Sequence, residues 1–140
     1  MKNRSKLLAL ALSLGLFATS CSNDDNGGET LAPLASKWNI SQIGTTVNGE
    51  EQLFDAPQNQ SGCDKDYLDL NLDNSLTEGN YDSTVTACAL STNDGIYSRS
   101  HNDLTTVIDG ITKTVDIVNL TLTELKTRDD SGAIKVYVRN

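Results

Sequence analysis

Few residues in this chain could do catalytic chemistry, and they do not form a recognisable set. His101 is the single histidine, the residue type used most often as a general base. It stands beside Asn102 and Asp103 in a polar stretch that predicts an exposed turn. A serine or cysteine nucleophile needs a base within hydrogen-bond reach, and no second base is on offer. We therefore predict that the chain is not an enzyme.

Metal and cofactor motifs are equally weak. Asp69, Asn71 and Asp73 have the spacing of the first ligands of a calcium-binding loop. However, Asn74 replaces the glycine that such a loop requires, and Asn80 stands where a bidentate glutamate is needed. The leucines between these residues alternate as they do in a strand, so we interpret the polar residues as one strand face. No glycine-rich phosphate loop follows a predicted strand. We predict no metal and no cofactor.

Cys63 and Cys88 are an isolated pair of cysteines in the main part of the chain. In an exported protein such a pair is typical of a disulfide. Closing a loop of about 25 residues would stabilise the fold by about 3.5 kcal/mol in the chain-entropy model. Two buried free thiols are the alternative, while a two-cysteine metal site is disfavoured because His101 lies in a predicted turn. We predict a structural disulfide.

The N-terminus has the pattern of an export signal. Lys2, Arg4 and Lys6 precede an apolar run of about twelve residues, which is shorter than the roughly twenty needed to cross a bilayer. Small residues then lead to Cys21. This arrangement resembles the lipobox of bacterial lipoproteins, in which the cysteine is lipidated and begins the mature chain. The resemblance implies that residues 1–20 are a cleaved signal peptide and that Cys21 carries the lipid.

Charge limits the partners of the mature chain. After removal of residues 1–20, eight basic and 19 acidic residues remain, a formal charge of −11. Nucleic acid is excluded as a partner because its phosphates require a basic surface. Anionic lipid would also be repelled, so the lipid on Cys21 is the expected membrane contact. We expect a lipid-anchored protein of the bacterial cell envelope, at the outer membrane and facing either the periplasm or the surface.

Residues 21–34 carry acidic, glycine and proline residues and very few apolar ones. This composition predicts a flexible tether between the lipid and the folded domain. The acidic pair Asp24–Asp25 resembles the export signal of surface-displayed lipoproteins of Bacteroidetes. A solvated spacer explains the same residues equally well.

From residue 35 to residue 140 the hydrophobic pattern has a period of two rather than 3.6, which indicates strands. In KWNISQI, for example, Trp38, Ile40 and Gln42 share one predicted face. Asn48–Gly49 marks a turn, and Asp109–Gly110 is a two-residue hairpin signal between Ile108 and Ile111.

Later in the chain, residues 84–90 are predicted to form a strand and residues 91–95 a loop. Turn signals of this kind divide the region into roughly eight to ten short strands at 8–12-residue spacing. A sandwich or an up-and-down barrel suits such a pattern. We favour an all-β, antiparallel up-and-down barrel in one domain, residues 35–140, because closure removes exposed strand edges. We expect a monomer.

Several motifs in a fixed order resemble the lipocalin-like lipoproteins of Bacteroidetes and Flavobacteria. They are KWNISQI, NGEEQ, a cysteine shortly before KDYLDLNLDNSL, a second cysteine, and Gly-x-Tyr before a Leu-Thr strand. The resemblance covers about Ala35 to Asn140. In lipocalins the first strand opens with Gly-x-Trp, and an arginine of the last strand packs across the tryptophan ring. The matching positions are Ser36, which departs from the glycine, Trp38 and Arg139.

The resemblance implies a barrel with one closed end and one open mouth that holds small apolar molecules. A small barrel can also be filled by its own side chains. The residues expected to point inward, as core or as ligand lining, are Trp38, Ile40, Leu68, Leu70, Val107, Val115, Ile117 and Val136.

A further modification site is suggested by the segment Asp82-Ser83-Thr84. It resembles the Asp-Ser/Thr-x site at which Bacteroidetes O-glycosylate exported proteins. The segment falls in a predicted turn, where a glycan on Ser83 could be accommodated.

Two functions fit these observations. The first is a lipid-anchored lipoprotein whose lipocalin-like barrel binds a small apolar or amphipathic ligand. The second is a non-catalytic interaction or structural module with a solid barrel, which would contact an envelope protein through its acidic loops. Asp55–Gly62 is the longest predicted connection and the leading contact segment for that second function.

Overall fold

The computed structural model describes residues 33–57, 60–82, 84 and 86–139, and within them the chain forms nine β-strands and no helix. The strands are β1 (Lys37–Val47), β2 (Glu50–Asp55), β3 (Tyr67–Leu70), β4 (Ser75–Asp82), β5 (Ala89–Ser100), β6 (Asp103–Ile108), β7 (Ile111–Leu120), β8 (Glu124–Arg128) and β9 (Ala133–Val138). The described part of the chain therefore offers no helix that could span a membrane.

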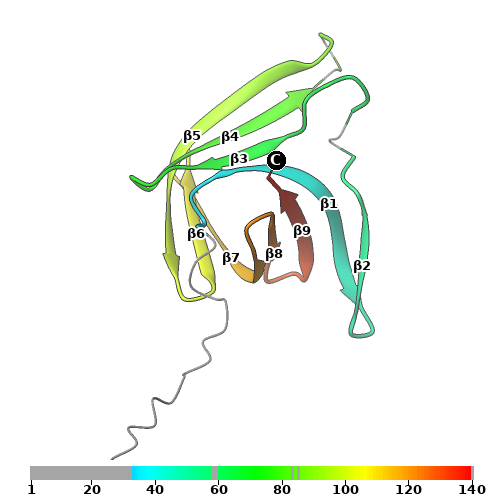
Figure 1. Cartoon of the computed structure of the whole chain (residues 1–140), viewed down its shortest axis with the longest axis vertical. Coiled ribbons are helices and arrows are strands. Elements are labelled where there is room, and N and C mark those ends of the chain that lie inside the picture. The colour runs from blue at the N-terminus through cyan, green and yellow to red at the C-terminus, as the bar shows by residue number, and fades with distance from the viewer. Residues whose placement is uncertain (1–32, 58–59, 83, 85, 140) are drawn as a thin grey trace, which may run out of the picture.

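The strands close into a barrel through β1. From β3 to β9 each strand pairs antiparallel with the next, and β9 pairs back with β1. Figure 1 shows β3 to β9 and β1 arranged as a ring, with β2 lying outside it beyond β1. β1 is long enough to pair with β3 at its start and with β2 further along. These findings confirm the predicted antiparallel up-and-down barrel.

Tight turns separate the strands where the sequence indicates them. Asn48 and Gly49 have φ values of 53° and 85°, and Asp109 and Gly110 have values of 51° and 77°. Left-handed backbone of this kind suits the two-residue turns of hairpins and is tolerated best by glycine, asparagine and aspartate. Both predicted hairpin turns are confirmed.

Trp38 fills the closed end of the barrel. Its side chain is 0 % exposed, and its Nε1 donates a hydrogen bond of 2.8 Å to the carbonyl oxygen of Leu34. The Arg139 guanidinium lies 5.1 Å from the centre of the indole ring, which confirms the predicted contact. Arg139 Nε also donates to the carbonyl oxygen of Leu122. Leu34 is 8 % exposed and belongs to the core, although the prediction assigned it to the tether.

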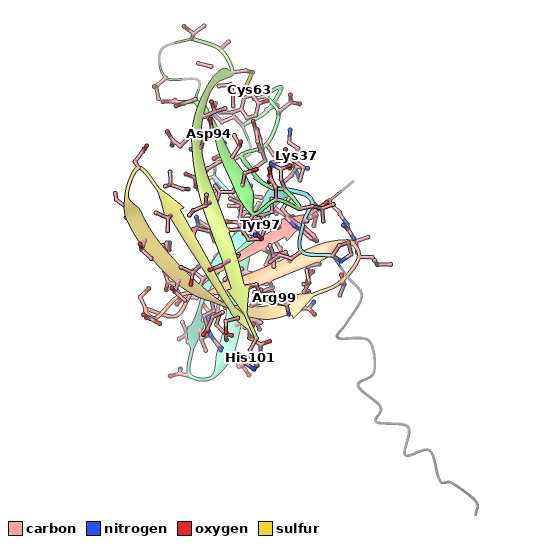
Figure 2. The ribbon with its side chains drawn as sticks, turned by 90° about the vertical axis from the view of Figure 1, so that its left-hand side faces the viewer. Lys37, Cys63, Asp94, Tyr97, Arg99 and His101 are labelled. Atoms are coloured by element: carbon pink, nitrogen blue, oxygen red, sulfur yellow. A yellow bond between two sulfur atoms is a disulfide. The ribbon has the colours of Figure 1, made fainter. Side chains whose placement is uncertain are left out.

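The structure corrects the predicted order of strand and loop between residues 84 and 95. The described residues from Thr84 to Cys88 form bends and turns, and β5 runs unbroken through residues 91–95. Residues 91–95 are polar, but pairing with β4 holds their backbone in a strand. Across this pair of strands, Thr77 Oγ1 donates a hydrogen bond of 2.8 Å to Asp94 Oδ1. A Cβ on Gly95 would lie 2.3 Å from the carbonyl oxygen of Val107, so close packing of β6 requires glycine within the strand. Figure 2 shows Asp94 and Tyr97 along this one strand.

A second, smaller apolar layer lies outside the barrel beneath the β1–β2 hairpin. Ile134 and Val136 of β9 are 1 % and 3 % exposed although their register places them on the outer face. Glu51 of β2 forms an ion pair of 2.7 Å with Lys126 of β8, and in the sheet β1 and β9 lie between those two strands. The hairpin must therefore curl over β9. A Cβ on Gly44 would lie 2.8 Å from Leu53 Cδ2, so glycine permits this close curl.

The predicted disulfide is present between Cys63 and Cys88, with an S–S distance of 2.12 Å. It joins the connection after β2 to the turn between β4 and β5. Asp66 attaches the same connection just before β3: its Oδ1 accepts a 2.7 Å hydrogen bond from Tyr81 N, and its carbonyl oxygen accepts one of 2.8 Å from Ile40 N. The last part of the loop, from Cys63 to Asp66, is thus attached to the barrel at two points.

Removing the disulfide should destabilise the fold. We expect Cys63→Ser combined with Cys88→Ser to lower the free energy of unfolding by about 2–5 kcal/mol, because the unfolded chain gains the freedom of a 25-residue loop. Urea unfolding of both proteins would measure the difference. A wild-type melting temperature that does not change under reducing conditions would contradict the prediction.

Candidate functional site

Six of the eight residues predicted to point inward do so. Each of the six either lines the barrel interior or belongs to its core. They are Trp38, Ile40, Leu68, Leu70, Val115 and Ile117. The structure corrects the other two. Val107 lies between Thr106 and Ile108, which both line the interior, so its side chain faces outward.

Val136 is the second correction. Its neighbours Lys135 and Tyr137 line the interior, so alternation places Val136 on the outer face, beneath the β1–β2 hairpin. In the pairing of β1 with β9, a bulge between Ile40 and Gln42 shifts the register, so that the residues of β1 after the bulge change faces. Gln42 therefore pairs with Val136 on the outer face rather than sharing the face of Ile40.

A cavity of about 200 Å³ occupies the barrel interior above the packed closed end. One wall, from β6 and β7, is mainly apolar and is formed by Leu104, Ile108, Ile111 and Val115. Thr106 and Lys113 lie between these apolar residues on the same two strands, and the other strands contribute Leu68, Glu78, Thr127, Lys135 and Tyr137. The cavity lining is therefore mixed, with charged groups set among apolar side chains.

The charged groups that line this cavity form no ion pair among the described residues. Two ion pairs form among the described residues, Glu51–Lys126 and Asp116–Arg128, and neither involves Glu78, Lys113 or Lys135. Two lysines against one glutamate give the cavity a net positive charge in a strongly acidic chain. The charge of this lining therefore favours an anionic group over a neutral one.

Lys113 lies near the hairpin turn between β8 and β9, at the open end. The pKa of Asp129 in that turn is lowered first by the hydrogen bond from Ser131 Oγ at 2.6 Å and then by the Ala133 amide, with a smaller contribution from the positive charge of Lys113. This places the Lys113 ammonium at the mouth rather than deep in the barrel.

Tyr137 lines the same cavity. Burial raises its pKa, and the carboxylates of Glu78 and Asp66 raise it further. A recess of about 50 Å³, which shares Glu78, Lys135 and Tyr137 with the main cavity, extends from there to Asp66. The phenol is thus held neutral among acidic neighbours.

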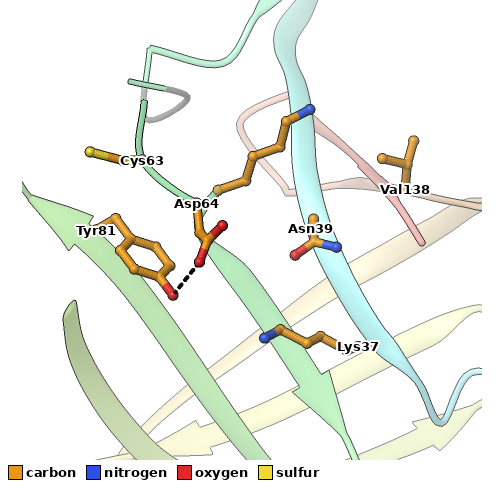
Figure 3. A pocket seen from close by; sticks show the side chains of 7 residues that line it. Lys37, Asn39, Cys63, Asp64, Tyr81 and Val138 are labelled. Atoms are coloured by element: carbon orange, nitrogen blue, oxygen red, sulfur yellow. Dashed lines mark hydrogen bonds between the residues drawn. The ribbon is translucent and has the colours of Figure 1, made fainter. Parts of the chain in front are cut away.

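A separate cleft of about 570 Å³ lies on the outside of the barrel (Figure 3). It is formed between the outer face of β1 and the disulfide-bonded loop, with contributions from β4 and β9. Its lining is mainly polar and consists of Lys37, Asn39, Cys63, Asp64, Lys65, Tyr81 and Val138. We call this space the outer cleft. Tyr81 OH donates to Asp64 Oδ2 at 3.4 Å within it.

The residues considered for catalysis or metal binding do not assemble into a site. His101 is exposed in the turn between β5 and β6 (Figure 2). Arg99 Nε donates a hydrogen bond of 2.8 Å to the carbonyl oxygen of His101. Asp73 Oδ1 accepts from the amide and hydroxyl of Ser75, which lower the Asp73 pKa and fix a turn. In the described residues no three His, Cys, Asp or Glu side chains gather around a metal position. Cys21 and Ser83 lie outside the described residues.

Comparison with known proteins agrees with this geometry. The model of the lipocalin-like domain family matches residues 34–127, which is more than half of the chain. The chain belongs to the lipocalin-like domain family.

Solved structures show the same fold. A lipocalin-like protein from Bacteroides uniformis superposes with a TM-score of 0.59 at 13 % identity, over 76 % of this chain and 98 % of that one. An uncharacterized protein from Bacteroides eggerthii gives a TM-score of 0.56 at 10 % identity, over 77 % and 100 % of the two chains. No curated protein sequence matches significantly.

The polar residues of the interior were not among the predicted site residues. Lys113 stands two positions from both Ile111 and Val115, and Lys135 stands two positions from Tyr137. Strict alternation would have placed both lysines on the inward faces of their strands. The alternating pattern of this lipocalin-like domain therefore already indicated that both lysines point into the barrel.

Alkaline pH should destabilise the domain through Tyr137. Because the folded-state pKa of Tyr137 is raised, its contribution to stability is complete below the ordinary tyrosine pKa of about 10 and is lost as the pH rises beyond it. We expect Tyr137→Phe to lose less stability than the wild type between about pH 9 and pH 11. Urea unfolding of both proteins across this range would test it, and parallel pH profiles would contradict it.

Proposed function

We propose that this protein is a lipid-anchored lipoprotein of the bacterial cell envelope whose barrel binds a small molecule with an apolar body and an acidic group. One observation carries the proposal for the ligand. The apolar residues that line the interior cavity on β6 and β7 lie in the same space as Lys113 and Lys135, and neither lysine forms an ion pair among the described residues. No catalytic activity is part of the proposal.

The size of the cavity limits the ligand. A dry cavity of about 150 Å³ accommodates benzene. The interior space of about 200 Å³ therefore suits a single ring with a short side chain, or an acyl chain of similar bulk. Retinoids and haem are too large for this volume. A ligand with a longer chain would have to leave part of it in the mouth.

The charge of the cavity favours an acid over a neutral molecule. A hydrogen bond between a charged lysine and a carboxylate contributes about 1.5–3 kcal/mol when it is sheltered from water. Glu78 offsets one of the two positive charges, so the site suits one carboxylate rather than two. The hydrocarbon part would lie against Ile108 and Val115, where it is removed from water.

The position of Leu34, where the folded domain begins, supports an anchor that leaves the mouth of the barrel open. Leu34 packs at the closed end of the barrel against Trp38. A tether running from a lipid on Cys21 would thus reach the domain at the end opposite the cavity mouth. Ligands could enter without passing the tether.

Binding of single-ring and short-chain acids tests the ligand proposal. We expect 4-phenylbutyrate or hexanoate to bind the mature protein, and Lys113→Gln or Lys135→Gln to weaken binding about tenfold each, since a charge-assisted hydrogen bond is lost. Isothermal titration calorimetry would measure the affinity. Lys126→Gln is the matched control, because Lys126 lines neither the interior cavity nor the outer face near Lys37 and instead pairs with Glu51.

The neutral alcohol hexanol should bind equally to the wild type and to both lysine variants. If no acid of either kind binds, the barrel is solid. In that case the protein acts as an interaction module through its loops.

Cys21→Ala tests the anchor separately. Loss of the acceptor thiol should release the protein from the membrane fraction of its host, because the acidic domain has no other attraction to anionic lipid. Fractionation followed by immunoblotting would show it, with Cys63→Ser as the control cysteine. Continued membrane retention of the Cys21 variant would contradict the lipoprotein proposal.

A further inference from the structure

The outer cleft is independent of the barrel interior in its position and in its chemistry. Its lining shares no residue with the interior cavity, and it opens on the outer face of β1. We propose that the outer cleft is a second binding site, for a polar molecule that carries one anionic group and several hydroxyl groups, as uronic acids and sugar phosphates do. The observations that support it are the fixed walls, the excess of positive charge and the mixed donors and acceptors.

The walls of the cleft are held in place from several directions. The loop wall is attached to the β4–β5 turn by the Cys63–Cys88 disulfide and to β1 and β4 through Asp66. Asp66 is 8 % exposed, so its hydrogen bonds are sheltered from water. A site that is already formed does not lose binding energy to the ordering of a loop.

The positive charge comes from Lys37 and Lys65, against the single carboxylate of Asp64. Lys37 Nζ lies 3.8 Å above the Tyr67 ring, which positions its ammonium group. Figure 3 shows Lys37, Asn39, Asp64 and Tyr81 directed into the same space. In a chain with 19 acidic residues, this cleft is a place where an anionic group gains rather than loses electrostatic energy.

The remaining polar groups suit hydroxyls. The Asn39 amide can donate and accept, and the Asp64 carboxylate accepts. Tyr81 OH contacts Asp64 at 3.4 Å, which is long for a bond between two oxygens, so a ligand hydroxyl can compete for the same carboxylate. A carboxylate in the cleft would repel a bare anion, but it can accept hydrogen bonds from a sugar.

Little apolar surface is available in the cleft. Apart from Val138 and the disulfide, its lining consists of polar or charged side chains. A volume of about 570 Å³ falls within the usual range for small-molecule sites, which is about 300–1,000 Å³. The cleft thus selects a hydrated polar molecule, in contrast to the amphipathic ligand proposed for the interior.

Calorimetric titration of the mature protein with glucuronate, glucose 6-phosphate, glucose and inorganic phosphate would test the inference. We expect the two acidic sugars to bind at least about tenfold more tightly than glucose and than phosphate. Lys37→Gln and Asn39→Ala should each weaken the acidic sugars by about tenfold, since each removes one hydrogen bond to the ligand. Lys113→Gln, in the interior, should leave them unchanged.

Three results would overturn the inference: no heat from either acidic sugar up to about 10 mM, equal binding of glucose, or Lys37→Gln binding like the wild type. Phosphate that binds as tightly as glucose 6-phosphate would overturn the hydroxyl part and leave a simple anion site. The interior site is tested with other ligands and other variants than the outer cleft. The two titrations therefore show separately which of the two proposals is wrong.

Discussion

The pairing of β1 with strands on both of its edges is the constraint on which the rest of the structure depends. β9 pairs along one edge, and β3 and then β2 pair along the other. Closure of the ring converts one face of β1 into barrel interior and the other into outer surface. Trp38 and Ile40 consequently contribute to the core, while Lys37 and Asn39 line the outer cleft. One short segment thus supplies walls to two separate spaces.

The interior is packed at its closed end and carries charged groups toward its mouth. At the closed end, Trp38 is covered by Leu34 and Arg139, and this end is packed with large apolar side chains. Toward the mouth, Lys113 and Lys135 stand at inward positions of their strands but are exposed to solvent. A charge that is removed from water without a partner is costly, so these lysines must stay hydrated or meet an anion. The mouth therefore gives up core packing in a way that a solid barrel would not require.

The sequence was sufficient for the fold class, the hairpin turns, the disulfide and the contact of Arg139 with Trp38, because each rests on local residue types or on a family resemblance. It failed where neighbouring strands decide. β6 has apolar residues on both of its faces, Leu104 on one and Val107 on the other. Only the pairing with neighbouring strands shows that Leu104 points into the barrel. Residues 91–95 look like a loop, yet β4 gives their backbone a partner. The bulge after Ile40 reverses the faces of β1, which no alternating pattern could reveal.

The outer cleft was invisible to the sequence for a different reason. Its residues come from β1, the loop after β2, β4 and β9, and its polar members each have the appearance of an ordinary surface position in the sequence. What brings them together is the disulfide and the buried Asp66, which hold a polar loop against a strand face. Polar loops that only connect strands do not need two such attachments. The double attachment, rather than any single lining residue, is what distinguishes this cleft from the rest of the barrel exterior.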